Sequence, residues 1–266
     1  MRCGIYRAYQ GRYSGAKEMK IHEFGERNRG NIVMIHGECM PWELFGDAIG
    51  ILSRRFHIYA VAVPGHDIAS DEEFTSVEDV ASRIELTLAK HGVPHIDLLY
   101  GFSLGGALAM RMLTDGAVPV MHAVIDAGPA PRESNGILDS LFAPSNPLKR
   151  GRSSRSAIDK IFPPQKINAA SADKIYLLMQ RMSGNTTDRI FRSMYCYELP
   201  ETLSAQGCTI EYWYGSEEAD RLKYDIGYVG SRIPGVIMRP LAGMCHGEYV
   251  LSFPEQFAGD IGRRML

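Results

Sequence analysis

Short apolar segments alternate with longer segments of helical periodicity along most of the 266-residue chain. Most of these apolar segments are continuous and do not alternate with polar residues, which is typical of parallel strands buried on both faces. This strand–helix alternation predicts an α/β fold with a mostly parallel, doubly wound sheet. The six predicted strands are Asn31–Ile35, His57–Val63, His95–Tyr100, His122–Asp126, Cys208–Tyr214 and Gly235–Pro240.

Amphipathic segments with helical spacing follow several of these strands. The helix that begins near residue 77 has Thr75 or Ser76 as its N-cap, and Glu78 and Asp79 would lie in its first turn, where negative charge is favourable. The four predicted helices of the sheet region are Trp42–Arg55, Val77–His91, Leu104–Asp115 and Pro254–Arg264.

The alternation stops between Gly128 and Pro200 and then resumes. The interval is rich in proline at first and then contains two predicted helices, Ala172–Met182 and Thr187–Tyr197. A helical insertion of this kind is commonly a cap over a functional site. We therefore expect a core of residues 1–127 and 201–266 and a cap of residues 128–200. A minority of the apolar side chains of the cap should face a substrate, with candidates Tyr176, Leu178, Met179, Met182, Phe191, Met194 and Tyr195.

The overall charge of the chain argues against nucleic-acid binding. The net charge of −2 and the pI near 6.5 give no electrostatic reason to expect nucleic-acid binding. One basic segment, Lys149–Arg155, is interpreted as a solvated loop, with binding of an acidic substrate group as the alternative.

Cysteine usage and the N-terminal sequence predict a cytoplasmic, soluble protein. The five cysteines are scattered and form no C-x-x-C pair, so neither a disulfide framework nor a zinc knuckle is expected. The N-terminal residues are too polar for a signal peptide, and no apolar run approaches the roughly 20 residues of a membrane span. The cysteines are Cys3, Cys39, Cys196, Cys208 and Cys245.

A G-x-S-x-G motif, Gly101 to Gly105, lies between a predicted strand and a predicted helix. A tight strand-to-helix turn would strain the backbone of Ser103 and leave no room for a Cβ at Gly101 or Gly105. The same turn would expose the Ser103 hydroxyl at a helix N-terminus, where the N–H of Leu104 could bind an oxyanion. The alternative is a glycine-rich loop with a serine helix cap.

A nucleophilic serine needs a base, and the base needs an acid that orients it. His246 follows the last predicted strand and precedes the C-terminal helix, which makes it the leading candidate among eight histidines. The loop after Cys208–Tyr214 carries Glu217, Glu218 and Asp220 as candidate acids, although acidic residues also favour the start of a helix.

The order Ser103, acidic residue, His246 resembles that of the α/β-hydrolase family. "MIHG" (34–37) resembles the family's His-Gly motif, which would make Glu38 the second oxyanion N–H donor. "VPGHD" (63–67) resembles the Pro-Gly-His-Gly motif, with Asp67 in place of the final glycine. The family's Gly-x-x-Asp motif aligns with 215–218 and implies Glu218 as the acid.

Three features of this resemblance leave alternatives open. The family more often has aspartate at the acid position, so Glu217 stays possible, and Asp126 lies where some members place their acid. Only the backbone N–H of Glu38 is needed, and its carboxylate would be unhelpful beside an oxyanion unless the side chain turns away.

The resemblance implies a serine hydrolase that cleaves a carboxylic ester or related acyl bond of a small molecule. Ser103, His246 and Glu218 would be catalytic, and the N–H groups of Glu38 and Leu104 would form the oxyanion hole. The alternatives are a carbon–carbon bond hydrolase, thioesterase, amidase or lactonase, or a slow ligand-binding protein on the same scaffold. No cofactor is implied. His-Gly-Glu occurs twice, at 36–38 and 246–248, but without metal-ligand spacing, so no metal is expected.

Overall fold

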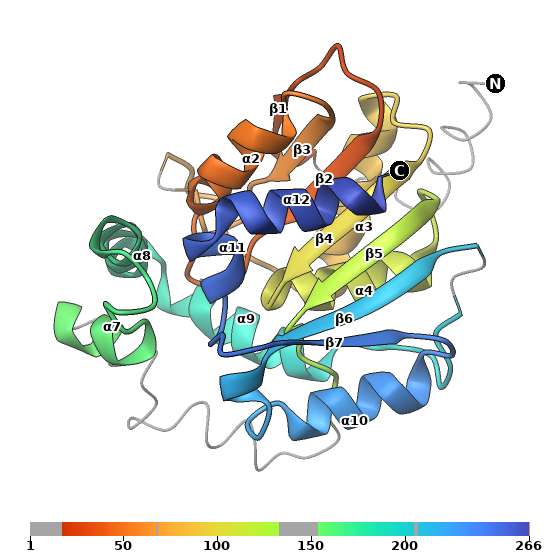
Figure 1. Ribbon diagram of the computed structural model, residues 1–266. Helices are drawn as coiled ribbons and strands as arrows, with labels where there is room; N and C mark the ends of the chain where they lie inside the picture. The colour runs from red at the N-terminus through yellow and green to blue at the C-terminus, as the bar shows by residue number, and fades with distance from the viewer. Residues whose placement is uncertain (1–17, 68, 133–153, 205–206, 266) are drawn as a thin grey trace.

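The sheet has seven strands in the order β1-β3-β2-β4-β5-β6-β7. The computed structural model describes residues 18–67, 69–132, 154–204 and 207–265 (Figure 1). All neighbouring strands pair in parallel except β1 and β3, which confirms the predicted α/β class with a mostly parallel sheet. The strands are β1 (Ile21–Phe24), β2 (Asn31–Ile35), β3 (His57–Val61), β4 (Ile96–Phe102), β5 (Val120–Asp126), β6 (Thr209–Gly215) and β7 (Ile237–Leu241).

Six of the seven strands coincide with the predicted apolar segments to within two residues at either end. The exception is β1, "IHEF", an antiparallel edge strand whose four residues are all only partly buried. Its mixed polarity gives no continuous apolar run, which explains why the sequence pattern did not indicate it.

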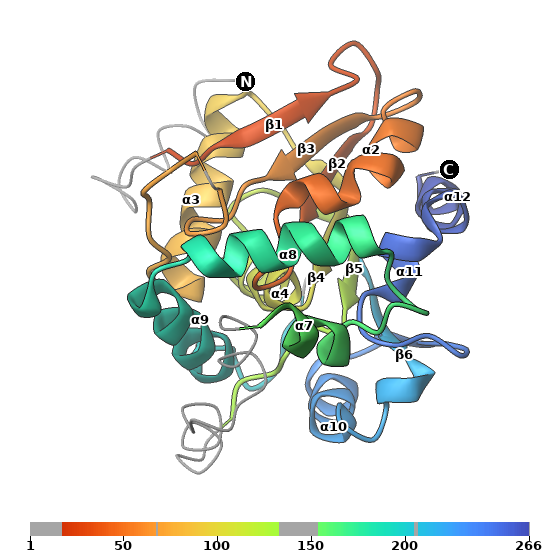
Figure 2. The ribbon, with the colours of Figure 1, turned by 90° about the vertical axis from the view of Figure 1, so that its left-hand side faces the viewer.

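Helices cover both faces of the sheet. In Figure 2 α3 (Val77–Lys90) lies on one side of the sheet and α12 (Pro254–Arg264) lies on the other. The first face also carries α4 (Leu104–Asp115), which packs against α3 and the central strands, and the second carries α2 (Gly46–Leu52), which packs against α12. The Ser76 hydroxyl caps α3 by accepting a hydrogen bond from the N–H of Asp79, as one of the two predicted N-caps.

The predicted helix Trp42–Arg55 was wrong in its extent. A 3₁₀ turn, η1 (Trp42–Phe45), precedes α2, and α2 ends at Leu52. Glycines at 46 and 50 weaken the helical preference of this segment. Two short helices near the carboxyl end, α10 (Lys223–Arg232) and α11 (Glu248–Ser252), were not predicted.

Among the described residues, three helices between β5 and β6 lie near the carboxyl ends of the parallel strands (Figures 1 and 2). They are α7 (Arg155–Ile161), α8 (Ala169–Arg181) and α9 (Gly184–Cys196), of which α8 and α9 match the predicted helices. A hydrogen bond from the N–H of Val77 to the Ser193 hydroxyl ties α9 to α3. Most of the basic segment, residues 149–153, lies outside the described residues. The division into residues 128–200 and a two-part core stays a prediction.

The strand order reverses between β2 and β4, because β3 returns to one side of β2 and β4 pairs with the other side. Gly101 of β4 pairs with Ile35 of β2, so the loops that follow the two strands leave the sheet side by side. Open α/β sheets bind ligands in the crevice at such a reversal. This point brings residues 36–39 next to Ser103.

Candidate active site

Ser103 occupies a sharp turn between the last residue of β4 and the first residue of α4. Its backbone has φ 52° and ψ −115°, a region that residues with a side chain rarely adopt and that costs of order 1–3 kcal/mol. The turn is held on both sides, because the Ser103 N–H donates to the Asp126 carbonyl (2.8 Å) and the Ser103 carbonyl accepts from the Gly106 N–H (2.8 Å). The predicted strained turn is confirmed.

The glycines of the motif are required by close backbone contacts. A Cβ at Gly101 would collide with the Gly105 carbonyl, and a Cβ at Gly105 would collide with the Ile35 carbonyl. Backbone atoms at the junction of β2, β4 and α4 cannot move aside without disturbing the sheet. This explains why both positions need glycine, as the sequence predicted.

His246 lies in the loop after β7 and contacts Glu218, which ends the 3₁₀ turn η2 (Ser216–Glu218) after β6. The Nδ1 atom of His246 lies 2.8 Å from Glu218 Oε2, and the same oxygen accepts from Arg221 Nη2 at 2.5 Å. The ring of His246 packs against the ring of Phe102, with 4.7 Å between their centroids. Gly247 has φ 73°, and a Cβ there would lie 2.8 Å from the Phe102 ring.

The contact between His246 and Glu218 favours a positively charged imidazole and a negatively charged carboxylate. Burial alone would lower the pKa of His246, but the charge of Glu218, its hydrogen bond and the charge of Glu38 outweigh burial and raise that pKa. Burial alone would raise the pKa of Glu218, but His246 and Arg221 outweigh it and hold that pKa below its ordinary value. The imidazole is therefore oriented and made more basic.

The two alternative acids, Glu217 and Asp126, form hydrogen bonds with residues other than His246. Glu217 is exposed and accepts a hydrogen bond from Lys166 Nζ at 3.1 Å. Asp126 is buried, and its Oδ2 accepts from the Tyr100 hydroxyl at 2.7 Å. Burial raises the pKa of Asp126 to about 7, which the Tyr100 hydrogen bond only partly offsets. Glu218 is the carboxylate that the structure brings to His246.

The Ser103 hydroxyl donates its hydrogen bond to Glu38, with 2.6 Å between Oγ and Oε2. The Glu38 carboxylate therefore does not turn away from the Ser103 hydroxyl. Among the described residues, no hydrogen bond joins Ser103 to His246. The backbone N–H groups of Glu38 and Leu104 also have no hydrogen-bond acceptor among the residues that the structure describes. Both N–H groups are free to bind a ligand oxygen.

Two buried histidines fix the loop that carries Glu38. His36 Nε2 accepts from the Val63 N–H at 3.1 Å, and His66 Nε2 accepts from the Cys39 N–H at 3.0 Å. Burial lowers the pKa of His36 to about 3 and that of His66 to about 4, so both rings are neutral at pH 7 and can accept these bonds. The motifs at 34–37 and 63–67 thus hold each other in place.

A small cavity of about 90 Å³ is lined by both Ser103 and His246. Its charged lining residues that the sequence did not indicate are Arg132, Arg221 and Asp225. Arg221 lies just beyond the acidic loop, so its proximity to Glu218 was the one available signal. Met194 and Tyr195, two of the candidate cap residues, line this cavity. The full lining is Glu38, Ser103, Ala127, Pro129, Arg132, Met194, Tyr195, Arg221, Leu222, Asp225 and His246.

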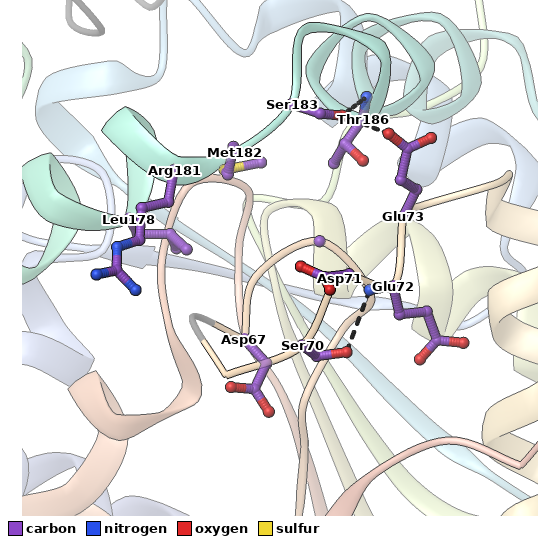
Figure 3. A pocket seen from close by; sticks show the side chains of 11 residues that line it. Asp67, Ser70, Asp71, Glu72, Glu73, Leu178, Arg181, Met182, Ser183 and Thr186 are labelled. Carbon is purple, nitrogen blue, oxygen red and sulfur yellow. Dashed lines mark hydrogen bonds between the residues drawn. The ribbon is translucent and has the colours of Figure 1, made fainter.

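A larger hollow of about 480 Å³ lies between the 65–73 loop and the α8–α9 connection (Figure 3). It contains neither Ser103 nor His246, and its acidic side chains are largely engaged. Glu73 accepts from Ser183 and Arg189, and Glu72 pairs with Arg83. Despite its larger volume, this hollow therefore lacks both candidate catalytic side chains that line the smaller cavity.

Two further features concern metals and membranes. The described ranges contain no group of three or more histidine, cysteine or acidic residues placed to hold a metal ion. None of the helices in these ranges has the length and apolar character needed to span a bilayer.

Comparison with known proteins agrees with this geometry. Residues 32–221 match the Alpha/beta hydrolase family. The 2-succinyl-6-hydroxy-2,4-cyclohexadiene-1-carboxylate synthase of Escherichia coli O157:H7 (strain EC4115) is 28% identical over 100 residues, which are 36% of this chain and 38% of that protein. The match thus spans about two-fifths of the length of this curated relative.

Solved structures share the fold across nearly the whole chain. Naproxen esterase (carboxylesterase NP) from Bacillus subtilis superposes with a TM-score of 0.73 at 14% identity, covering 98% of this chain and 96% of that chain. MenH from S. aureus superposes with a TM-score of 0.67 at 14% identity, covering 94% of this chain and 100% of that chain. At this identity the likeness concerns the fold alone.

Proposed function

Because the chain belongs to the α/β-hydrolase family, we propose that it is a serine hydrolase that cleaves a carboxylic ester or related acyl bond. The observation that carries the proposal is the strained Ser103 turn, which shares one cavity with His246, whose Nδ1 contacts Glu218. The likeness to the fold of an esterase is consistent with this chemistry.

In the proposed mechanism, the Ser103 hydroxyl leaves Glu38, transfers its proton to His246 and attacks the carbonyl carbon of the substrate. Glu218 holds the imidazole and stabilises the cation that forms. The N–H groups of Glu38 and Leu104 bind the oxyanion, and loss of one such donor typically costs about 10²–10³ in rate. His246 then protonates the leaving alcohol, and water cleaves the acyl-enzyme.

Helices α7 to α9 are proposed to form a cap within residues 128–200 that shapes the acyl side of the cavity. The presence of Met194 and Tyr195 in the cavity lining supports this role. The free cysteines of the described residues support a proposed cytoplasmic location.

The proposal is tested by labelling and hydrolysis. The purified protein should react with a fluorophosphonate probe at Ser103 and hydrolyse p-nitrophenyl esters, and Ser103→Ala should abolish both. A chain-length series of these esters would then define the acyl pocket. Retention of both activities by Ser103→Ala would refute the assignment.

A second candidate is a reaction other than acyl-bond hydrolysis at the same site, such as the cleavage of a carbon–carbon bond. The partial similarity to a synthase and the hydrogen bond that ties Ser103 to Glu38 favour it. In this case the probe would label Ser103 slowly or not at all, while esters, thioesters and amides would all stay intact.

A further inference from the structure

Glu38 is the one carboxylate in the cavity lining with no cationic partner among the described residues. Arg132 Nη2 pairs with Asp225 Oδ2 at 2.8 Å, and Arg221 Nη2 pairs with Glu218 Oε2 at 2.5 Å. These contacts leave two arginines matched by two carboxylates, and the charge of Glu38 is left over. Burial, the largest influence on both rings, lowers the pKa of His246 and raises that of Tyr195, and the charge of Glu38 helps to raise both.

The position of the Glu38 carboxylate disfavours the reaction of a neutral substrate. Glu38 Oε2 lies 2.6 Å from the atom that attacks the carbonyl, so its negative charge would oppose the oxyanion. It also holds the hydroxyl proton that His246 must receive. A substrate group that neutralises Glu38 and takes its hydrogen bond would remove both obstacles at once.

The distance limits where such a group can sit. A carboxylate in contact with Ser103 Oγ lies within reach of a substituent on the atom next to the reacting carbonyl carbon. An α-ammonium group has the right charge, donates up to three hydrogen bonds and occupies this position.

Resting on the serine-hydrolase function above, we propose that the site takes α-amino acyl esters and that Glu38 binds their ammonium group. When it binds, the ammonium replaces Ser103 on the Glu38 carboxylate, and the hydroxyl turns to His246. The Ser103 Oγ–carbonyl bond forms as the ester C–O bond breaks, and the proton passes through His246 to the leaving alcohol. Water then releases the free amino acid.

The test uses three benzyl esters that differ only at the α-carbon: L-alanine, L-lactate and propionate, with an ammonium, hydroxyl or methyl group. Release of benzyl alcohol is measured at pH 6.5, below the ordinary α-amino pKa of about 7.7–8.0. We expect kcat/KM for the alanine ester to exceed that for the propionate ester at least tenfold in the wild type. In Glu38→Gln the ratio should fall to within about threefold of unity, and Glu38→Asp should retain part of it.

Glu217→Gln is the matched control, because Glu217 is exposed, pairs with Lys166 and does not line the cavity. It should keep the wild-type ratio. A ratio near unity in the wild type, or a ratio unchanged in Glu38→Gln, would overturn the proposal. A preference for benzyl hydrogen succinate over benzyl butyrate would also overturn it, since the arginines would then set the charge preference.

The outcomes separate this proposal from the one on which it depends. Hydrolysis of the propionate ester that requires Ser103 but shows no preference for alanine would refute only the role of Glu38. Failure to hydrolyse all three esters, together with no fluorophosphonate labelling of Ser103, would refute both.

Discussion

The Nδ1 atom of His246 lies 2.8 Å from Glu218 Oε2, whereas the nearby Asp126 is satisfied by the hydroxyl of Tyr100. Asp126 ends β5 and Glu218 lies in η2 after β6, and of these two buried carboxyl groups only Glu218 contacts the imidazole. The contact follows from η2, which turns the chain back immediately after β6 and directs Glu218 toward the loop after β7.

This difference predicts unequal effects of neutralising the two acids. Glu218→Gln should lower kcat/KM for a reactive ester by roughly 10³–10⁴-fold, because the imidazole loses its orientation and the stabilisation of its cation. Asp126→Asn should change the same quantity by less than about tenfold, since the Tyr100 hydroxyl can still donate to an amide oxygen. Steady-state kinetics of both variants would measure the two effects. A larger loss of kcat/KM in Asp126→Asn than in Glu218→Gln would assign the acid to Asp126.

The pH profile should report the charge of Glu38. Because His246 must be neutral to accept the Ser103 proton, kcat/KM rises with pH through the pKa of His246. Glu218 and Glu38 raise that pKa over the effect of burial, so the acidic limb should lie above the ordinary value of about 6.5.

Glu38→Gln removes one of the charges that raise this pKa, so the limb should move to lower pH. The measurement uses a neutral ester, so that the substrate itself does not titrate. Glu217→Gln is the control and should leave the limb in place. A limb that does not move in Glu38→Gln would show that the Glu38 charge does not reach the imidazole.

The glycine of the serine turn can be tested by stability. Gly105→Ala should destabilise the protein by about 1–3 kcal/mol or prevent folding, because the new Cβ collides with the Ile35 carbonyl. Gly227→Ala is the matched control: it lies within α10, and a Cβ there meets nothing within 4 Å. This variant should be neutral or more stable by up to about 1 kcal/mol. Urea unfolding of both variants would check the prediction. Equal unfolding midpoints for Gly105→Ala and Gly227→Ala would contradict it.

The parts of the site that sequence could predict are those set by chain order and local sterics. Ser103 follows a strand whose apolar run is continuous, His246 follows the last predicted strand, and the glycines at 101 and 105 have one steric explanation. The direction of the Glu38 side chain could not be predicted, because it depends on the pairing of β2 with β4 and on the hydrogen bond between Cys39 and His66. Arg132 reaches the cavity through its contact with Asp225, 93 residues away in sequence, which no local pattern indicates.

Buried Glu85 gives a prediction that does not involve the active site. This residue of α3 is fully buried, its Oε1 accepts from the Ala117 and Val118 N–H groups, and its Oε2 has no hydrogen-bond partner among the described residues. Burial raises its pKa to about 8, which the two N–H groups only partly counter. The folded protein therefore holds this proton over a pH range where the unfolded chain, with an ordinary pKa near 4.5, has released it.

The sign of the effect on stability follows from that difference in bound protons. Between about pH 4.5 and about pH 8 the unfolded chain binds fewer protons at this group, so Glu85 makes the free energy of unfolding fall as pH rises, by roughly 1 kcal/mol per pH unit. Glu85→Gln cannot ionise, and its amide oxygen can accept the same two N–H groups. Urea unfolding at pH 5, 6, 7 and 8 should show the wild type losing stability relative to Glu85→Gln at each step. Glu255→Gln, at an exposed position in α12, is the control and should show the same pH dependence as the wild type. If the difference in free energy of unfolding between the wild type and Glu85→Gln is constant, Glu85 is ionised in the folded protein throughout this range.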